Sequence, residues 1–593
     1  MKGPIIGTAA CASYEPTNLC GLSSAYYDFS DAPIVTTDAP EPTNAAYSAK
    51  PAWSPTDVPP GQQYSWMETF RMSPEDRARH VSAMNDEINK QFAAGGGWDY
   101  LPEGATLEKS IGVCRLKQHD LHGGAGEIKA RFCVNGKQTE VPSGGWETTA
   151  NVASVAQILT VIAIANERDM KLKQIDVKSA FTQVKLPEGQ HIWVQPLPGI
   201  KDPEGKGRVI RLDHHIYCHP LANAAWAKKW TEILTEYGFT AVDREGTVFV
   251  YDNENDKIIV STVVDDSVVA YDNEAKFNDF LKHVKRHVPI DVADLEHICG
   301  LRVTRDLRNG TISVDQTEYI EQKASQFGIT EGGHVYKTPM ETDFKLGERP
   351  ATADVGLVKL ARSLNGSLIY ATLTRPECKY PCSKLASITI NPTEDDTNAM
   401  RRVLKYLYDT RNTKLTFTKG PWTGPDGTTH EPNQLVVYVD AGFAQESERR
   451  SQTGFVMMLN GAAIFAKSGR QTQLADSTGY AETIALHEAT HWVVGYRRLL
   501  ANLGFTQKVP TPIYEDSSSA VAFAKQGMGQ RSLHYEVKYL YVTELEKSGE
   551  ISVRKIDTKQ QIADVLTKPV AWDTAKTLVK YMLGSDLVFT GSS

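Results

Sequence analysis

The feature that most constrains this chain of 593 residues is a pair of adjacent aspartates, Asp265 and Asp266, set between two apolar segments. Residues 257–264 (KIIVSTVV) precede the pair and residues 267–271 (SVVAY) follow it. Both segments are rich in strand-forming residues, so the sequence predicts a tight β-hairpin with two carboxylates at its tip. Adjacent carboxylates repel each other, and a fold that holds them together usually does so for a cation. A solvated Asp-Asp turn is the alternative explanation for this tetrapeptide taken alone.

A third aspartate ends another apolar segment upstream of the hairpin. Asp176 lies in residues 175–181 (IDVKSAF). Together with Asp265 and Asp266 it supplies the carboxylate set that two-metal phosphoryl transfer needs.

Four further acids stand at strand-like or helix-like positions in the last third of the chain. Two of them end apolar segments typical of buried strands, and the other two stand in or before helical patterns. With their local sequences, they are Asp440 (LVVYVD), Glu482 (YAETIAL), Asp516 (IYED) and Asp564 (ADVLTKP).

These motifs together resemble the reverse transcriptase and ribonuclease H portion of polyproteins from copia-type LTR retrotransposons. The first two match the family's palm motifs VDD and DVK-x-AF, and the later four match its ribonuclease H motifs Y-x-DAD, S-S-T-x-AE, DN-x-SA and LAD-x-x-TKP. Residues 364–376 (LNGSLIYATLTRP) match the family's helical segment L-x-GSLLY-x-x-x-TRP. The resemblance covers nearly all of the chain beyond its N-terminal tail. It implies an α+β multidomain fold, with a right-hand polymerase of fingers, palm and thumb followed by a ribonuclease H-like α/β domain.

The domain boundaries combine this resemblance with local composition. Residues near the N-terminus are rich in Pro, Thr and Ala without periodicity, a composition that does not bury enough apolar surface to offset the entropy of ordering. A segment rich in Gly, Pro and Thr marks a linker further along. The expected parts are a disordered acidic tail (1–65), fingers and palm (66–330), a thumb- or connection-like helical region (331–420), a linker (421–433) and the ribonuclease H-like domain (434–585).

The resemblance also implies metal ions and their ligands. Two Mg²⁺ or Mn²⁺ ions are expected at each site, because the family's chemistry in both domains is two-metal phosphoryl transfer. We expect Asp176 and Asp265 to bind both palm ions and Asp266 to act less directly. The expected ligands of the second site are Asp440, Glu482, Asp516 and Asp564.

Three further residues of the polymerase part receive expected roles in binding the incoming nucleotide. Lys129 and Arg131 lie in residues 128–134 (IKARFCV), and a guanidinium fork suits triphosphate oxygens. Phe181 matches the family's aromatic residue that excludes a ribose 2′-hydroxyl. The alternatives are a solvated Lys/Arg pair and a core phenylalanine.

His534 resembles a family histidine near the ribonuclease H product, with a structural or solvated histidine as the alternative.

One segment departs from the family pattern. Residues 215–226 (HIYCHPLANAAW) stand where the family has SLYGLKQAP-x-x-W, so Cys218 replaces a glycine, Leu221 a glutamine and Asn223 a proline. Because that segment positions template and nucleotide in the family, we expect slow DNA synthesis with a high apparent KM. All seven expected metal carboxylates are nevertheless present.

Composition sets limits on compartment and partners. Eight cysteines without CxxC spacing disfavour a zinc knuckle or a disulfide framework and fit a reducing compartment. No apolar run is long enough to span a bilayer, so we expect an intracellular protein that does not bind membranes. It would be located in the cytoplasm, free or in virus-like particles, or in the nucleus. The net charge of −8 does not predict nucleic-acid binding, although basic runs occur at 282–287 and 401–419.

The sequence thus predicts an RNA-directed DNA polymerase with ribonuclease H activity. Its expected partners are an RNA template, a DNA primer, an RNA–DNA hybrid and deoxynucleoside triphosphates. The altered segment leaves two alternatives open. One is a decayed copy that binds nucleic acid without polymerising, and the other is an enzyme active only through its ribonuclease H domain.

Overall fold

A computed structural model of the chain describes residues 63–116, 128–136, 139, 150–253, 255–444, 449–527 and 539–590. The predicted acidic tail lies almost entirely outside these residues. His534 also lies outside them. In the described part, no helix is both long and apolar enough to cross a membrane. The chain forms several sheets with helices packed on them, so the predicted α+β multidomain class is confirmed.

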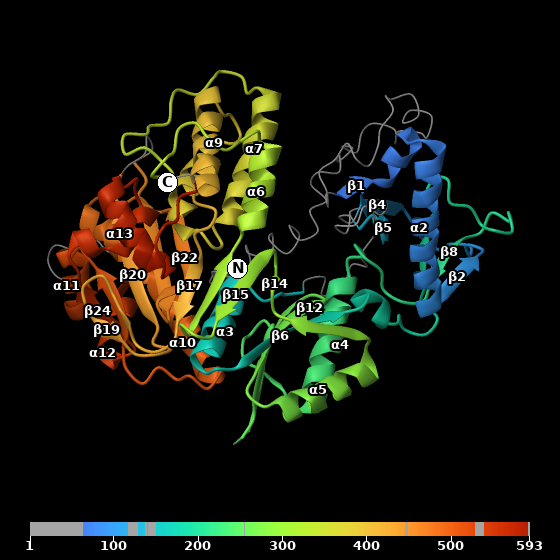
Figure 1. Cartoon of the computed structure of the whole chain (residues 1–593), viewed down its shortest axis with the longest axis horizontal. Coiled ribbons are helices and arrows are strands. Elements are labelled where there is room, and N and C mark those ends of the chain that lie inside the picture. The colour runs from blue at the N-terminus through green and yellow to red at the C-terminus, as the bar shows by residue number, and fades with distance from the viewer. Residues whose placement is uncertain are drawn as a thin grey trace, which may run out of the picture.

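The N-terminal lobe is built around helix α2 (Pro74–Ala94) at one end of the molecule's long axis (Figure 1). The helix begins where the Ser73 side chain accepts a hydrogen bond from the backbone N–H of Asp76, and proline occupies its first position. It ends at Gly95, whose φ of 136° favours glycine. The strands of this lobe form sheets of order β1-β4-β5 and β2-β8-β7-β3: β1 (Gln63–Ser65), β2 (Gly96–Asp99), β3 (Leu107–Glu108), β4 (Ser110–Leu116), β5 (Ile128–Val134), β7 (Ile192–Val194) and β8 (Val209–Leu212).

The central part is a six-stranded sheet of order β13-β6-β12-β11-β10-β9. Side chains alternate between its two faces, so one apolar set packs on α4 and α5 and the other on α3. The elements are α3 (Val155–Glu167), β6 (Lys171–Val177), α4 (Ala222–Tyr237), β9 (Thr240–Ala241), β10 (Val248–Asp252), β11 (Lys257–Val263), β12 (Asp266–Tyr271), α5 (Glu274–His287) and β13 (Ile290–Asp294).

Helix α3 is apolar on all sides because it is buried between two parts of the molecule. It packs on the central sheet and also on the C-terminal domain, where the Asn460 side-chain amide donates to the carbonyl of Ala163 at 3.1 Å. The central and C-terminal parts therefore share one continuous core.

A helical region and a small sheet connect these parts. The sheet has the order β14-β15-β16-β17, and its last strand follows the helices in sequence. Helices α6, α7 and α9 stand together beside the C-terminal domain (Figure 1). The elements are β14 (His297–Ile298), β15 (Leu301–Asp306), β16 (Thr311–Asp315), α6 (Thr317–Gln326), α7 (Val355–Ala371), α8 (Lys379–Ala386), α9 (Glu394–Asp409) and β17 (Leu415–Thr418).

The range expected to be a linker contains a short hairpin of β18 (Trp422–Thr423) and β19 (Thr429–His430). Trp422 and His430 are buried in it and their rings lie 4.5 Å apart, so apolar packing fixes this segment.

The C-terminal domain is a five-stranded sheet of order β22-β21-β20-β23-β24. Strands β20, β23 and β24 run parallel to one another, while β20, β21 and β22 are antiparallel neighbours. The elements are β20 (Val436–Gly442), β21 (Gln452–Leu459), β22 (Ala462–Arg470), α10 (Thr478–Asn502), β23 (Thr511–Glu515), α11 (Ser518–Gln526), α12 (Leu540–Ser548), β24 (Ile551–Lys555), the 3₁₀ turn η9 (Ile562–Leu566) and α13 (Trp572–Leu583).

Candidate active sites

The predicted hairpin is present in the central sheet. Strands β11 and β12 pair in antiparallel register with Val263 opposite Asp266, which leaves Val264 and Asp265 as the turn. Val264 has a φ of 55°, a conformation that favours glycine and is strained for a β-branched residue. The indole N–H of Trp226 donates to the Val264 carbonyl at 2.7 Å. The tip is therefore held in a sparsely populated conformation, as often occurs at functional sites.

The three palm aspartates meet at this tip. Asp266 lies directly opposite Asp176 on the neighbouring strand β6, so both side chains share the face of the sheet on which α3 packs. The Asp265 carbonyl accepts a hydrogen bond from the N–H of Val177 at 2.9 Å, which fixes the turn against β6. On the other side of β6, Asp291 of β13 also lies opposite Asp176. Asp291 could not be recognised from its local sequence, because its place beside Asp176 depends on strand order.

These palm carboxyl groups are only partly buried. Burial and the neighbouring Asp265 raise the pKa of Asp266 to about 6, against a hydrogen bond from the Gln174 amide at 3.0 Å. Burial and Asp291 raise the pKa of Asp176, while the positive charge of Lys129 lowers it.

A hollow adjoins the hairpin tip. Arg131 and Phe181 line it together with Tyr217 and Trp226. Phe181 is 5% exposed and contacts the Tyr217 ring edge-to-face at 5.0 Å between centroids. Lys129 lies exposed on the same strand as Arg131, close enough to influence Asp176. The structure thus brings the expected nucleotide-binding residues to the side of the palm aspartates.

Residues 215–226, the segment that departs from the family pattern, lie against this hollow. Cys218, which stands where the family has glycine, has a φ of 65°. The backbone therefore keeps a glycine-like conformation although a side chain is present. Its carbonyl approaches Gly136, two residues beyond the end of β5, so closely that a Cβ added to this glycine would lie 2.0 Å from the carbonyl oxygen. Leu221 immediately precedes α4, and its side chain makes no capping hydrogen bond.

The second carboxylate set lies at one edge of the C-terminal sheet. Asp440 is on β20 and Asp516 directly follows the parallel neighbour β23, so both acids emerge at the same edge. Glu482, near the beginning of α10, completes a group whose ligand oxygens all lie within 4.8 Å of one another. Asp564 is in η9, which the Gln561 amide ties to the carbonyl of Val439 at 2.8 Å.

Burial dominates the electrostatics of this second site. It raises the pKa of Glu482 to about 11, with contributions from Glu515 and then Asp440. Burial and Asp440 likewise raise the pKa of Asp564 to about 7. One buried oxygen each of Glu482 and Glu515, Oε2 in both, has no hydrogen-bond partner. Mg²⁺ and Mn²⁺ prefer carboxylate oxygens, so the orphaned buried oxygens and the compact donor set fit such ions.

Two residues of this site were not recognised from the sequence. Glu515 is fully buried beside Asp516, and its position in an otherwise apolar strand was the available signal. Lys568 belongs to the TKP motif, and its ammonium lies 2.9 Å from Asp564 Oδ1 and 3.9 Å from Asp440 Oδ2. The hydroxyl of the preceding Thr567 donates to Asp440 Oδ2.

Comparison with known proteins agrees with these motifs. Residues 102–342 match the family of reverse transcriptases (RNA-dependent DNA polymerases). The chain is 28% identical over 480 residues to the retrovirus-related Pol polyprotein from transposon TNT 1-94 of Nicotiana tabacum, which covers 79% of this chain and 35% of that protein. It is 26% identical over 553 residues to the Pol polyprotein from transposon RE2 of Arabidopsis thaliana, with 91% and 37% covered. The chain therefore spans little more than a third of the length of these relatives.

Two solved structures show more distant likenesses. One is a foamy viral protease-reverse transcriptase in complex with an RNA/DNA hybrid, with a TM-score of 0.40 and 13% identity over 72% of this chain and 49% of that chain. The other is LC11-RNase H1, with a TM-score of 0.19 and 16% identity over 23% of this chain and 93% of that chain. The resemblance predicted from the motifs is confirmed: residues 102–342 match the reverse-transcriptase family, and most of the chain is similar to Pol polyproteins of copia-type retrotransposons.

Proposed function

We propose that this chain is an RNA-directed DNA polymerase with a separate ribonuclease H site. The observation that carries the proposal is the presence of two carboxylate sets on two different sheets, each at the end of its strands. The first set adjoins a hollow lined by a cationic and an aromatic side chain, as nucleotide binding requires. The RNA template, DNA primer, RNA–DNA hybrid and deoxynucleotides are the substrates of this proposal.

At the palm, the residues of the chain bind and orient the substrate. Arg131 reaches the hollow with a guanidinium that suits a triphosphate, and Lys129 adds positive charge beside Asp176. Phe181 forms an apolar wall where a ribose 2′-hydroxyl would have to fit. Asp176 and Asp265 are the proposed shared ligands of the ions, with Asp266 held by Gln174.

At the C-terminal site, Asp440, Glu482, Asp516 and Asp564 are the proposed ligands, and all of them except the half-buried Asp516 are buried. Divalent ions bound at either site supply Lewis-acid stabilisation of the attacking and leaving oxygens. Cleavage of the RNA strand of a hybrid uses water as the nucleophile in place of a primer hydroxyl.

The test is a pair of substitutions in the purified full chain, assayed by primer extension on an RNA template and by cleavage of a labelled hybrid. Asp265→Asn should lower synthesis by about a thousandfold, equivalent to about 4 kcal/mol, and leave cleavage intact. Glu482→Gln should do the reverse. Asp294→Asn, exposed on β13, and Glu488→Gln, on the same helix as Glu482, are the matched controls. Parental rates in Asp265→Asn or Glu482→Gln would refute the corresponding site.

The departing segment supports a second candidate, a protein whose ribonuclease H site works while synthesis is weak. Cys218 places a side chain at a glycine-like backbone position beside the hollow. The same two assays separate the candidates, because the second one predicts hybrid cleavage without efficient primer extension.

A further inference from the structure

The C-terminal site contains one more acidic side chain than its four expected ligands. Glu515 lies fully buried among them, so five acids share one edge of the sheet: Asp440, Glu482, Glu515, Asp516 and Asp564. Buried carboxylates held together repel one another unless cations or protons balance them. Lys568 brings a cation into direct contact with two of them.

The Lys568 ammonium sits between two carboxylates that belong to different elements. It lies 2.9 Å from an oxygen of Asp564 in η9 and 3.9 Å from an oxygen of Asp440 in β20. An ion coordinated by both of these oxygens would have to occupy the same space. The group formed by Asp440, Glu482 and Asp516 is compact without the lysine and is not blocked in this way.

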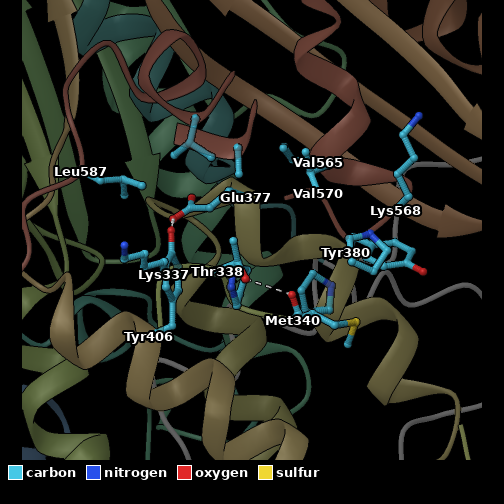
Figure 2. A pocket seen from close by; sticks show the side chains of 15 residues that line it. Lys337, Thr338, Met340, Glu377, Tyr380, Tyr406, Val565, Lys568, Val570 and Leu587 are labelled. Carbon is cyan, nitrogen blue, oxygen red and sulfur yellow. Dashed lines mark hydrogen bonds between the residues drawn. The ribbon is translucent and has the colours of Figure 1, made fainter. Parts of the chain in front are cut away.

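The backbone of Lys568 is fixed, but its side chain has room to move. The Lys568 N–H donates to the Asp564 carbonyl at 3.1 Å, and proline follows it in sequence. The aliphatic stem lines a cavity beside Tyr380 and Val565, and 37% of the side chain is exposed. Figure 2 shows the stem at the edge of this cavity, with the ammonium directed away from the other labelled side chains. The ammonium can therefore leave the carboxylates without unfolding η9.

We propose that the Lys568 ammonium occupies, in the metal-free protein, the position of one divalent ion between Asp440 and Asp564, and that this ion binds only by displacing it. This inference rests on the proposed ribonuclease H function, since it concerns the same carboxylates. It assigns Lys568 a positioning role toward the ions and makes the two ion positions unequal. The position at Asp440, Glu482 and Asp516 fills first, and the one that competes with the lysine fills at higher ion concentration.

The experiment measures Mn²⁺ binding by the full chain without nucleic acid, from the electron paramagnetic resonance signal of free Mn²⁺. Asp176→Asn and Asp265→Asn are present in every sample to weaken binding at the palm, and Glu236→Gln with His283→Gln removes the third potential ion-binding group, formed with His287. Lys568→Met keeps the apolar stem and removes the charge. The variant should strengthen binding of the more weakly bound ion, lowering its dissociation constant by about tenfold, equivalent to about 1.4 kcal/mol. The dissociation constant of the more tightly bound ion should stay unchanged.

Lys568→Arg, which keeps the charge, and Lys525→Met, an exposed position on α11, are the controls and should leave both constants near the parent values. Melting curves give a second measurement. In EDTA, Lys568→Met should melt below the parent because the carboxylates lose their counter-charge, and saturating Mn²⁺ should remove this difference. Lys568→Gln is a second neutral variant with the same expectation, in case Lys568→Met folds poorly.

The outcomes distinguish this inference from the function on which it rests. If the parent background binds no Mn²⁺, the proposed ribonuclease H site itself is wrong. If it binds two ions with constants that neither neutral variant changes, the site stands and the displacement by Lys568 is refuted.

Discussion

The palm and C-terminal carboxylate sites differ in how deeply their acidic side chains are buried and in how far the pKa values of these side chains are raised. The palm aspartates are partly exposed at a strained hairpin tip beside an open hollow, and the pKa of Asp266 rises only to about 6. The C-terminal acids, except the half-buried Asp516, are buried between a sheet, a helix and a 3₁₀ turn, and the pKa of Glu482 rises to about 11. An open site accommodates a primer end and a nucleotide, whereas a closed site needs counter-charges to remain folded.

The two sites nevertheless belong to parts of the molecule that share one continuous core. Helix α3 packs on both sheets, and the Lys257 ammonium of β11 donates to the carbonyl of Leu503 beyond α10 at 2.9 Å. The differences between the sites therefore arise from local burial and charge. Substitutions that act on one kind of environment should affect one site and spare the other.

The largest effect on stability is expected at the apolar wall of the palm. Phe181→Ala should lower the free energy of unfolding by about 3–5 kcal/mol, because the side chain is buried against Tyr217. If Phe181 also excludes the 2′-hydroxyl, ribonucleotide use relative to deoxynucleotide use should rise, while hybrid cleavage stays at the parental rate. Phe277→Ala, in the same core, is the control for lost packing. Equal sugar discrimination in both variants would leave Phe181 a core residue only.

The response of stability to metal should come mainly from the closed site. An ion at a thousand times its dissociation constant stabilises a protein by about 4 kcal/mol. Mn²⁺ should therefore raise the melting temperature of the parent. Glu482→Gln should lose most of this increase, because that side chain belongs to the compact donor group, and Asp265→Asn should lose little. Melting curves with and without Mn²⁺ measure this increase for each variant. A larger loss in Asp265→Asn than in Glu482→Gln would contradict the expectation that the C-terminal site dominates the response to metal.

The pH dependence of ion binding should also separate the two sites. Asp564 and Glu482 have pKa values raised to about 7 and about 11, so near neutral pH an ion must displace protons from them. Affinity at the C-terminal site should thus increase with pH, by about tenfold per unit for each proton released. At the palm, Asp266 is already ionised above about pH 6, so affinity there should be nearly flat. Calorimetry in buffers of different ionisation enthalpy counts the protons, and equal release at both sites would contradict the expectation.

The sequence predicted the parts of each site that depend on local order along the chain. The VDD hairpin follows from two strand-forming runs around an acid pair, and Asp440 from an apolar run that ends in an acid. It did not reveal Asp291 or Lys568, since their partners come from strands and turns distant in sequence. It also treated residues 421–433 as a linker by composition, although tertiary packing of a buried tryptophan and histidine decides that segment's structure.

The smallest effect is expected in residues 215–226, where Cys218 replaces the family's glycine and the backbone keeps a glycine-like conformation. A left-handed conformation costs a residue other than glycine about 1–2 kcal/mol, so Cys218→Gly relieves that strain but adds back some unfolded-chain entropy. We expect a net stabilisation of about 1 kcal/mol or less. Leu221→Gln adds an amide whose hydrogen bond to substrate contributes about 1 kcal/mol.

The double substitution Cys218→Gly with Leu221→Gln should therefore speed primer extension by about tenfold, mainly through a lower KM, and leave hybrid cleavage unchanged. Cys218→Ala is the matched control, because it removes the thiol but keeps the Cβ at the strained position. A gain in Cys218→Ala equal to that in Cys218→Gly would trace the effect to the thiol. Efficient synthesis by the parent, with no gain in the double variant, would mean that neighbouring residues such as Arg131 and Tyr217 already position the nucleotide.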